Sequence, residues 1–296
     1  MDRRHPIVAF DAQQFIEFFG DLASDLDVKL LTGGASNSNY LVRTSKGEQY
    51  VCRIHARGNP FVEKSVVARL RGIVPAPEYL WIGEGASVIE FIEGSHFQPS
   101  ARLMREAGQV LGQLKEISFE KSGQLLPNGE VAPFKGWGSF EEGLSGLLAQ
   151  EPVENLLGKN SITKLQDLLV QHRGTLEDFD SCHNLVHGDF RPDNILVSGD
   201  KITGIIDWEF AHSGCSYMDI GNLLRHASSE REQDFATGLR EGGFELPSDW
   251  RFRALLMDLA SHLEFLTSGR SSDFKLKCVA RIDALLKANA EQTQDT

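Results

Sequence analysis

The sequence predicts an α+β protein of two lobes, with an antiparallel sheet in the N-terminal lobe and mostly helices in the C-terminal lobe. Its 296 residues exceed the usual size of a single hydrophobic core. Short β-branched and aromatic runs separated by turns fill the first third of the chain. Longer segments with helical spacing of apolar residues follow.

The N-terminal third alternates between helical and strand patterns. Phe15, Phe18, Phe19 and Leu22 follow a helical period over residues 10–26, and Asp11 is the expected N-cap. A second helix is expected at 61–71. Pro75 and Pro77 end that helix. The strands are expected at 28–31, 41–44, 50–55, 80–82 and 87–91.

The rest of the chain predicts helices at 101–117, 162–179, 248–268 and 274–286. Ser100 is the expected N-cap of the first of these. Residues 121–146 hold six glycines and two prolines and therefore predict an extended insert outside the core. Its aromatic residues either hold this insert down, which we favour, or cover a substrate cleft: Phe134, Trp137 and Phe140. A polar tail that frays is expected at 292–296.

Composition predicts a soluble cytoplasmic protein. The chain is 41% hydrophobic and 24% charged. No run approaches the roughly 18 apolar residues that a membrane-spanning helix needs. The four cysteines are scattered, without a CxxC pair, so a zinc site or a disulfide framework is not expected.

The net charge of −12 argues against nucleic acid as a partner. An acidic surface would attract a cationic small molecule over a long range. An enzyme that is acidic only for solubility is the alternative, which we favour.

The stretch 185–224 holds three oxygen-bearing side chains at the ends of short strands. The apolar run 184–186 leads into His187-Gly188-Asp189, and Asn194 follows five residues after Asp189. Strands are expected at 195–197 and 202–206, and Asp207 follows the second one directly. The hairpin would therefore bring Asp189, Asn194 and Asp207 to one pocket.

Phosphoryl transfer is the chemistry that needs such a trio. Mg²⁺ takes one or two side-chain oxygens together with phosphates and water, and Asn194 and Asp207 suit that role. Asp189 would orient a substrate hydroxyl and accept its proton. The order matches the protein kinase template H-R-D-x-x-x-x-N followed by a metal-binding Asp. Taken singly, each residue could be ordinary turn or strand-end chemistry.

The pattern HGDxxxxN followed by Ile206-Asp207-Trp208 resembles the aminoglycoside phosphotransferase family. This family is similar to choline, fructosamine and homoserine kinases and implies a protein kinase-like fold. The later segment 217–224 is similar to the family's helix after the metal-binding Asp. The resemblance implies that Asp219 braces the catalytic loop from that helix, and we expect His187 to be a structural residue.

A glycine-rich turn and a cationic strand residue are expected to bind the nucleotide phosphates. The turn 33–40 contains Ser36, Asn37 and Ser38 but lacks the full G-x-G-x-x-G spacing, so a plain hairpin turn is the alternative. Arg53 stands where kinases have lysine, and Glu63 on the next helix is its expected partner. A surface arginine without a partner is the alternative.

The resemblance also implies a linker between the lobes near residues 92–98. The carbonyl of Glu90 and the N–H of Ile92 would bind adenine. The lobes would then be residues 1–93, which bind the nucleotide, and residues 94–296, which carry the catalytic loop, the metal site and the substrate-binding helices.

The expected reaction moves the γ-phosphoryl group of ATP or GTP, with Mg²⁺, to a hydroxyl of a small and possibly cationic substrate. Glu209 would bind an ammonium group of that substrate or make a structural salt bridge. A metabolic kinase for choline, a ketosamine, a sugar or homoserine is the alternative. A nucleotide-binding protein without transfer activity is a further one.

Overall fold

The structure is a computed structural model that describes residues 5–31 and 36–294. The chain forms two compact units. The first unit comprises Met1–Gln98, Leu126–Glu130 and Pro192–Ala211, and the second comprises Pro99–Leu125, Val131–Arg191 and His212–Thr296. The lobes expected at 1–93 and 94–296 stay a prediction.

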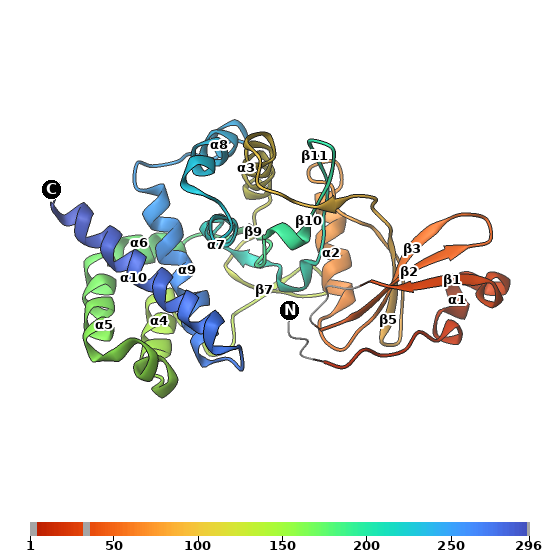
Figure 1. Ribbon diagram of the computed structural model, residues 1–296, viewed down its shortest axis with the longest axis horizontal. Coiled ribbons are helices and arrows are strands. Elements are labelled where there is room, and N and C mark those ends of the chain that lie inside the picture. Colours follow the sequence, from red (N-terminus) through yellow and green to blue (C-terminus); the bar gives the residue numbers. More distant parts are fainter. Residues whose placement is uncertain (1–4, 32–35, 295–296) are drawn as a thin grey trace. The chain divides into compact units, whose positions relative to one another are not determined.

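A five-stranded sheet forms the first unit and confirms the expected antiparallel sheet (Figure 1). Every neighbouring pair of its strands is antiparallel. In spatial order the strands are β1 (Leu26–Leu30), β2 (Ser38–Thr44), β3 (Gln49–Ile54), β5 (Ala86–Glu90) and β4 (Tyr79–Gly83).

One face of this sheet carries an apolar core. Alternate residues of the strands point to the same face, so Tyr40, Val42, Cys52 and Val88 pack with Phe15. That core is the reason for the aromatic pattern near the N-terminus.

The single helix expected at 10–26 is wrong. The segment is broken into η1 (Ala12–Phe15), α1 (Ile16–Phe19) and η2 (Gly20–Ser24). Gly20 has φ of +54°, which an α-helix does not contain. Asp11 is nevertheless the N-cap, because its side chain accepts the N–H of Gln13 at 3.0 Å.

The first unit is completed by one helix and a hairpin. Helix α2 (Pro60–Leu70) starts with Pro60 at its first turn, and the side chain of Asn59 caps it. The strands β10 (Ile195–Ser198) and β11 (Lys201–Ile205) form the expected hairpin, and β6 (Ser95–His96) pairs with β10. The short helices η3 (Pro192–Asn194) and η4 (Trp208–Phe210) flank this hairpin.

In the second unit, α3 (Ala101–Lys115) packs tightly against α8 (Ser229–Glu241). Ser100 caps α3 as expected, through the N–H of Leu103. Helix α8 was not expected from the sequence. The two helices approach closely because glycines line the contact: Gly108, Gly112, Gly238 and Gly242.

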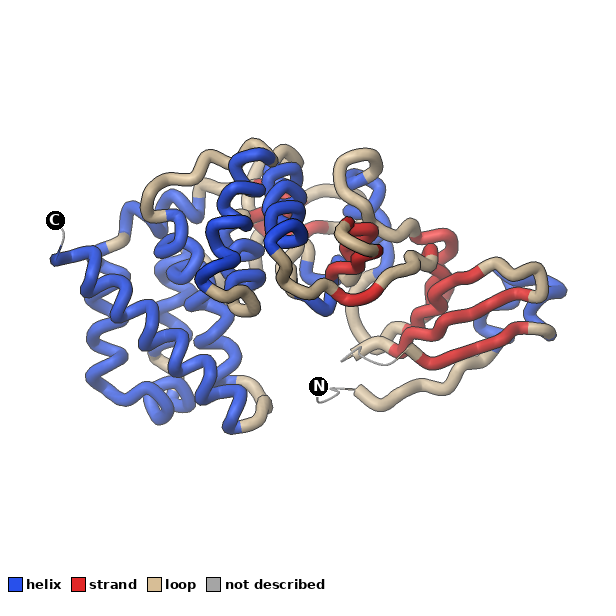
Figure 2. Tube along the Cα trace, turned by 45° about the horizontal axis from the view of Figure 1, so that its top comes forward, coloured by secondary structure: helices blue, strands red, loops and turns tan. Residues whose placement is uncertain are grey.

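The remaining long helices pack around α9 (Trp250–Thr267), which contacts α10 (Ser272–Gln294), α4 (Phe140–Leu148), α5 (Glu151–Gln171) and α7 (Tyr217–Leu224); they are among the blue helices of Figure 2. Helix α6 (Arg173–Asp180) follows α5, so the single helix expected at 162–179 is two helices. The side chains of the tail expected at 292–296 lie outside the described residues. No helix in the described part of the chain has the length and apolar character to span a bilayer.

The insert expected at 121–146 is partly wrong. It contains β7 (Gly123–Leu125), β8 (Val131–Ala132) and the start of α4, and both Leu125 and Leu144 are buried. Its aromatic side chains hold the segment in place, since Phe140 lies against Trp137 and against Phe179 of α6.

A four-stranded sheet positions the central motif of the second unit. Strand β9 (Asn184–Val186) pairs with β12 (His212–Gly214), and β7 and β8 extend the same sheet. The loop that begins at His187 therefore leaves a paired strand. Helix α7 follows β12.

Candidate active site

A buried ion pair lies at the centre of the first unit. Arg53 on β3 and Glu63 on α2 are 8% and 2% exposed, and Nη1 of Arg53 donates to Oε2 of Glu63 at 3.0 Å. Tyr79 donates its hydroxyl to the same oxygen at 2.6 Å, and Nε of Arg53 donates to Asn39 at 3.0 Å. The partnership expected from the sequence is therefore present, and the alternative of an unpaired surface arginine is wrong.

Asp207 extends this cluster. Its Oδ1 lies 3.7 Å from Nη1 of Arg53, and its side chain is 35% exposed. Burial opposes the charge of Arg53, but Tyr79, Glu63 and Asp207 outweigh it and raise the pKa of the guanidinium. Asp207 is also the one non-glycine residue with positive φ, at +68°, in the described part of the chain. Such strain is found where a side chain must be aimed.

Glu209 is a third carboxylate at this cluster, after Glu63 and Asp207. Burial, followed by repulsion from Asp207, raises its pKa to about 7. Its Oε2 lies 3.7 Å from Nε of Arg57, whose guanidinium stacks over Phe210. The structural salt bridge that the sequence left open is thus formed. Binding of a substrate ammonium by Glu209 stays a prediction.

Asn194 and Asp207 lie at the same end of the β10–β11 hairpin. Ile195 pairs with Ile205, and the N–H of Ile206 donates to the carbonyl of Asn194 at 2.9 Å. Asn194 itself is buried. The hydrogen bonds between β10 and β11 thus hold the backbone of Asn194 close to that of Asp207.

The loop after β9 is held by a buried carboxylate. Asp219 on α7 accepts the N–H of His187 at 2.7 Å and the N–H of Gly188 at 2.9 Å. Burial raises the pKa of Asp219, whereas these donors and the nearby His187 ring oppose the shift. Gly188 has φ of +81°, so the turn favours glycine there. Buried His187 accepts the N–H of Asp189 through Nδ1 at 3.2 Å.

The side chain of Asp189 is partly exposed and makes an ion pair within its own loop. Its Oδ2 lies 3.1 Å from Nε of Arg191. Arg191 was not expected in the site from the sequence. The signal was a cation two residues beyond the candidate base, on the same short loop.

The residues expected to cradle phosphate have structural hydrogen bonds. Asn37 accepts the N–H groups of Ala56 and Arg57 at 2.9 and 3.2 Å. Ser38 accepts the N–H of Val8 at 3.0 Å, and Ser36 is buried. The glycine-rich part of the turn at 32–35 lies outside the described residues. Phosphate binding by this turn stays a prediction.

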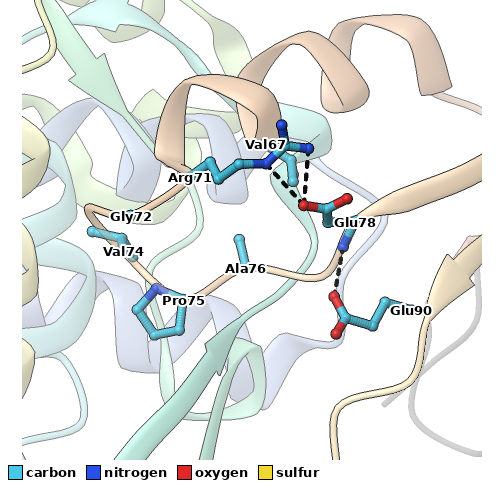
Figure 3. A pocket seen from close by; sticks show the side chains of 8 residues that line it. All are labelled: Val67, Arg71, Gly72, Val74, Pro75, Ala76, Glu78 and Glu90. Carbon is cyan, nitrogen blue, oxygen red and sulfur yellow. Dashed lines mark hydrogen bonds and ion pairs between the residues drawn. The ribbon is translucent and has the colours of Figure 1, made fainter.

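Glu90 ends β5 beside a cavity of about 170 Å³ (Figure 3). Its carboxylate accepts the N–H of Glu78 at 3.1 Å, and its own N–H donates to the carbonyl of Glu78 at 2.9 Å. Arg71 pairs with Glu78 on the same wall. The side chain of Ile92 instead packs close to Gly204 of β11. The adenine contacts expected of Glu90 and Ile92 stay predictions.

These features define a class of protein. A strand cation paired with a helix carboxylate, an Asp directly after a hairpin and a braced H-G-D loop are parts of a kinase-like phosphotransferase. The chain belongs to the phosphotransferase enzyme family, whose sequence pattern it matches over residues 27–256. It is a small-molecule phosphotransferase with an alcohol group as acceptor.

Related proteins support this assignment. A homoserine kinase from Zymomonas mobilis subsp. mobilis is 26% identical over 284 residues, which cover 86% of this chain and 84% of that protein. A thermostable mutant of the aminoglycoside phosphotransferase APH(4)-Ia, in complex with ADP and hygromycin B, matches with a TM-score of 0.70 at 20% identity, covering 94% of this chain and 98% of that one.

A macrolide 2'-phosphotransferase from Brachybacterium faecium, MphH, matches with a TM-score of 0.64 at 19% identity, covering 90% of this chain and 97% of that one. At such identities the solved structures show the fold, which confirms the expected kinase-like architecture.

Proposed function

We propose that this enzyme transfers the γ-phosphoryl group of ATP, or of GTP, to a hydroxyl of a small molecule, with Asp189 as the base. The observation that carries the proposal is the braced loop. Asp219 fixes the backbone of His187 and Gly188, while the carboxylate of Asp189 stays partly exposed. A fixed backbone with an accessible carboxylate suits a group that must orient an incoming hydroxyl.

The charged cluster of the first unit suits a nucleotide with Mg²⁺. Oε1 of Glu63 is buried without a hydrogen-bond partner in the described residues, and the partly exposed carboxylate of Asp207 belongs to the same cluster. Such oxygen donors fit a hard cation. Asp207 and Asn194 would hold Mg²⁺, which neutralises phosphate charge when bound, and Arg53 would contact the α- and β-phosphates.

No group of three or more His, Cys, Asp or Glu side chains in the described residues could hold a metal ion alone.

The proposed step is an in-line displacement. Asp189 accepts the proton of the substrate hydroxyl as its oxygen bonds to the γ-phosphorus. The bond between that phosphorus and the oxygen bridging to the β-phosphate breaks, and the nucleoside diphosphate leaves. The proton on Asp189 then passes to solvent.

We propose a hydroxy amino acid of the homoserine type as the first acceptor to test. The homoserine kinase relatives support this choice. A cationic acceptor is the second candidate, favoured by the net charge of −12. Four free cysteines support a reducing compartment such as the cytoplasm.

The test measures nucleoside diphosphate release from Mg-ATP and Mg-GTP over a panel of acceptors. The panel holds homoserine, choline, ketosamines, sugars, aminoglycosides and macrolides. Turnover on one class, lost by about 10²–10⁴-fold in Asp189→Asn, is the expected result. Undiminished turnover in Asp189→Asn would remove the proposed base. Absence of nucleotide binding to the wild-type protein would overturn the proposed nucleotide site.

Asp207→Asn separates the metal site from the fold. Asn tolerates positive φ at least as well as Asp, so the variant should keep its backbone conformation at this position. The affinity for Mg-ATP should fall, while the weak affinity for ATP without Mg²⁺ should not fall, because the variant loses a negative charge beside Arg53. Equal Mg-ATP affinities for the variant and the wild-type protein in a titration would count against the metal role.

A further inference from the structure

Two thiols of the second unit lie side by side. Cys182 follows the end of α6, and Cys215 follows β12 directly. Because Gly214 pairs with Asn184 in the antiparallel β9–β12 ladder, the chain brings the residues just beyond this pair together. The side chains of Cys182 and Cys215 are hydrogen-bonded to each other, and both cysteines are free thiols.

The two thiols differ in environment. Cys182 is partly exposed, and its Sγ donates to the carbonyl of Asp178 at 3.3 Å. The hydrogen bond from Cys215 lowers the pKa of Cys182 despite its burial, and Lys115 and Arg253 add positive potential. Cys215 is buried, and the hydrogen bond to Cys182 together with burial raises its pKa.

Such an asymmetric pair has the properties of an attacking and a resolving cysteine. The thiolate is the nucleophile, so the accessible cysteine with the lower pKa reacts first. A second thiol within reach then converts the mixed disulfide into an internal one.

We propose that Cys182 and Cys215 are a thiol oxidation site that closes to an internal disulfide on reaction with a low-molecular-weight disulfide of the glutathione class. The Cys182 thiolate attacks one sulfur of the reagent, forms a mixed disulfide and releases one reagent thiolate. The Cys215 thiol then loses its proton and attacks Sγ of Cys182, which releases the second reagent thiolate. One disulfide and two thiols thus become one protein disulfide and two reagent thiols.

The two cysteines flank the catalytic motifs in the sequence. The segment between the two cysteines contains His187, Asp189, Asn194 and Asp207. Cys215 also stands immediately before the N-cap of α7, the helix that carries Asp219. The disulfide would join the two ends of the segment that holds the catalytic motifs.

The test treats the full chain at neutral pH with oxidised glutathione and then counts free thiols in denaturant. The count should fall from four to two, and reduction should restore it. Peptide mapping should place the bond between Cys182 and Cys215. Cys52→Ala is the matched control, since Cys52 is buried apart from this pair in the first unit; its count should fall from three to one.

Two further variants separate the roles. Cys215→Ser should stop at a glutathione adduct on Cys182, whereas Cys182→Ser should resist modification at Cys215. A wild-type count that stays at four would overturn the proposal. So would a crosslink mapped to Cys52 or Cys278, or a wild-type product that stops at the mixed disulfide. These readouts do not depend on the acceptor substrate.

Discussion

The carboxylate of Asp219 lies 2.7 Å from the backbone nitrogen of His187 and accepts its N–H. Its other oxygen accepts the N–H of Gly188 at 2.9 Å. One side chain on a helix therefore satisfies two successive backbone donors of the loop that presents Asp189. The loop conformation depends on α7 as much as on its own sequence.

Replacing Asp219 should affect both stability and turnover. Asp219→Ala leaves the buried N–H of His187 and the partly buried N–H of Gly188 without an acceptor, which should cost about 2–5 kcal/mol of unfolding free energy. Misplacement of Asp189 should lower turnover by about 10²-fold. Urea denaturation and steady-state kinetics check both values, with Asp283→Asn on the exposed face of α10 as control. A variant as active as the control would show that the loop keeps its geometry without this brace.

The Arg53–Glu63 pair allows a structural role to be separated from phosphate binding. Arg53→Ala leaves the buried carboxylate of Glu63 without its cation and should cost about 3–5 kcal/mol in a urea titration. Arg53→Met combined with Glu63→Met should recover most of that loss, because an apolar pair removes the unpaired charge. The double variant should still bind Mg-ATP weakly.

The matched control for this pair is Arg71→Ala. Arg71 pairs with Glu78 at 2.9 Å, but its side chain is 70% exposed. Its loss should change the unfolding free energy by less than about 1 kcal/mol. Wild-type Mg-ATP affinity in the Arg53→Met, Glu63→Met variant would contradict a phosphate role for Arg53.

The lowered pKa of His55 should make the free energy of unfolding depend on pH. Burial and repulsion from Arg53 lower its pKa from 6.5 to about 4, and its ring accepts or donates a hydrogen bond to Ser87 at 2.9 Å. Between these two values the unfolded chain binds a proton that the folded chain does not. The stabilising effect of neutral His55 is therefore complete above pH 6.5 and is lost as the pH falls toward 4.

The measurement is the free energy of unfolding in urea at several values between pH 7 and pH 4. The wild-type protein should lose ~1–2 kcal/mol more than His55→Gln over this range, after allowance for solvent screening. His183→Gln is the control, since His183 is exposed. Parallel curves for the wild-type protein and His55→Gln would refute the assignment.

The glycines between α3 and α8 should not tolerate a methyl group. A Cβ at Gly238 would lie 1.8 Å from the carbonyl oxygen of Arg105, so one helix backbone would have to move. Gly238→Ala should lower stability by about 1–3 kcal/mol. Gly146→Ala on α4 is the control, because a Cβ there meets nothing within 4 Å and should raise stability by about 0.5–1 kcal/mol. Thermal denaturation of both variants measures these changes in stability. Equal changes of the same sign would contradict the close helix contact at Gly238.

The regular elements of the fold were predictable because turn residues and the spacing of apolar residues along the chain determine them locally. The β10–β11 hairpin follows from two β-branched runs around a turn at Gly199. The partnership of Arg53 with Glu63 follows from a strand cation and the next helix. The kinase-like fold was predictable because HGDxxxxN followed by Ile206-Asp207-Trp208 resembles the aminoglycoside phosphotransferase family.

Features that depend on tertiary contacts could not be predicted from the sequence. Helix α8 is mostly polar, and its buried side belongs to Phe235, Ala236 and Leu239. Its partner surface on α3 is made by glycines, which reduce helix propensity when a sequence is read alone. The left-handed backbone of Asp207 also has no local signature. The start of α4 was readable, because Ser139 and Glu142 form a capping box.

The first unit is assembled from three separate stretches of chain, and the last of them is Pro192–Ala211. During synthesis the ribosome releases the five strands of the sheet long before β10 and β11 emerge. The N-terminal unit therefore cannot complete its folding until about two thirds of the polypeptide has been made. A nascent chain arrested before residue 192 would consequently lack β10, which pairs with β6, and both expected metal ligands.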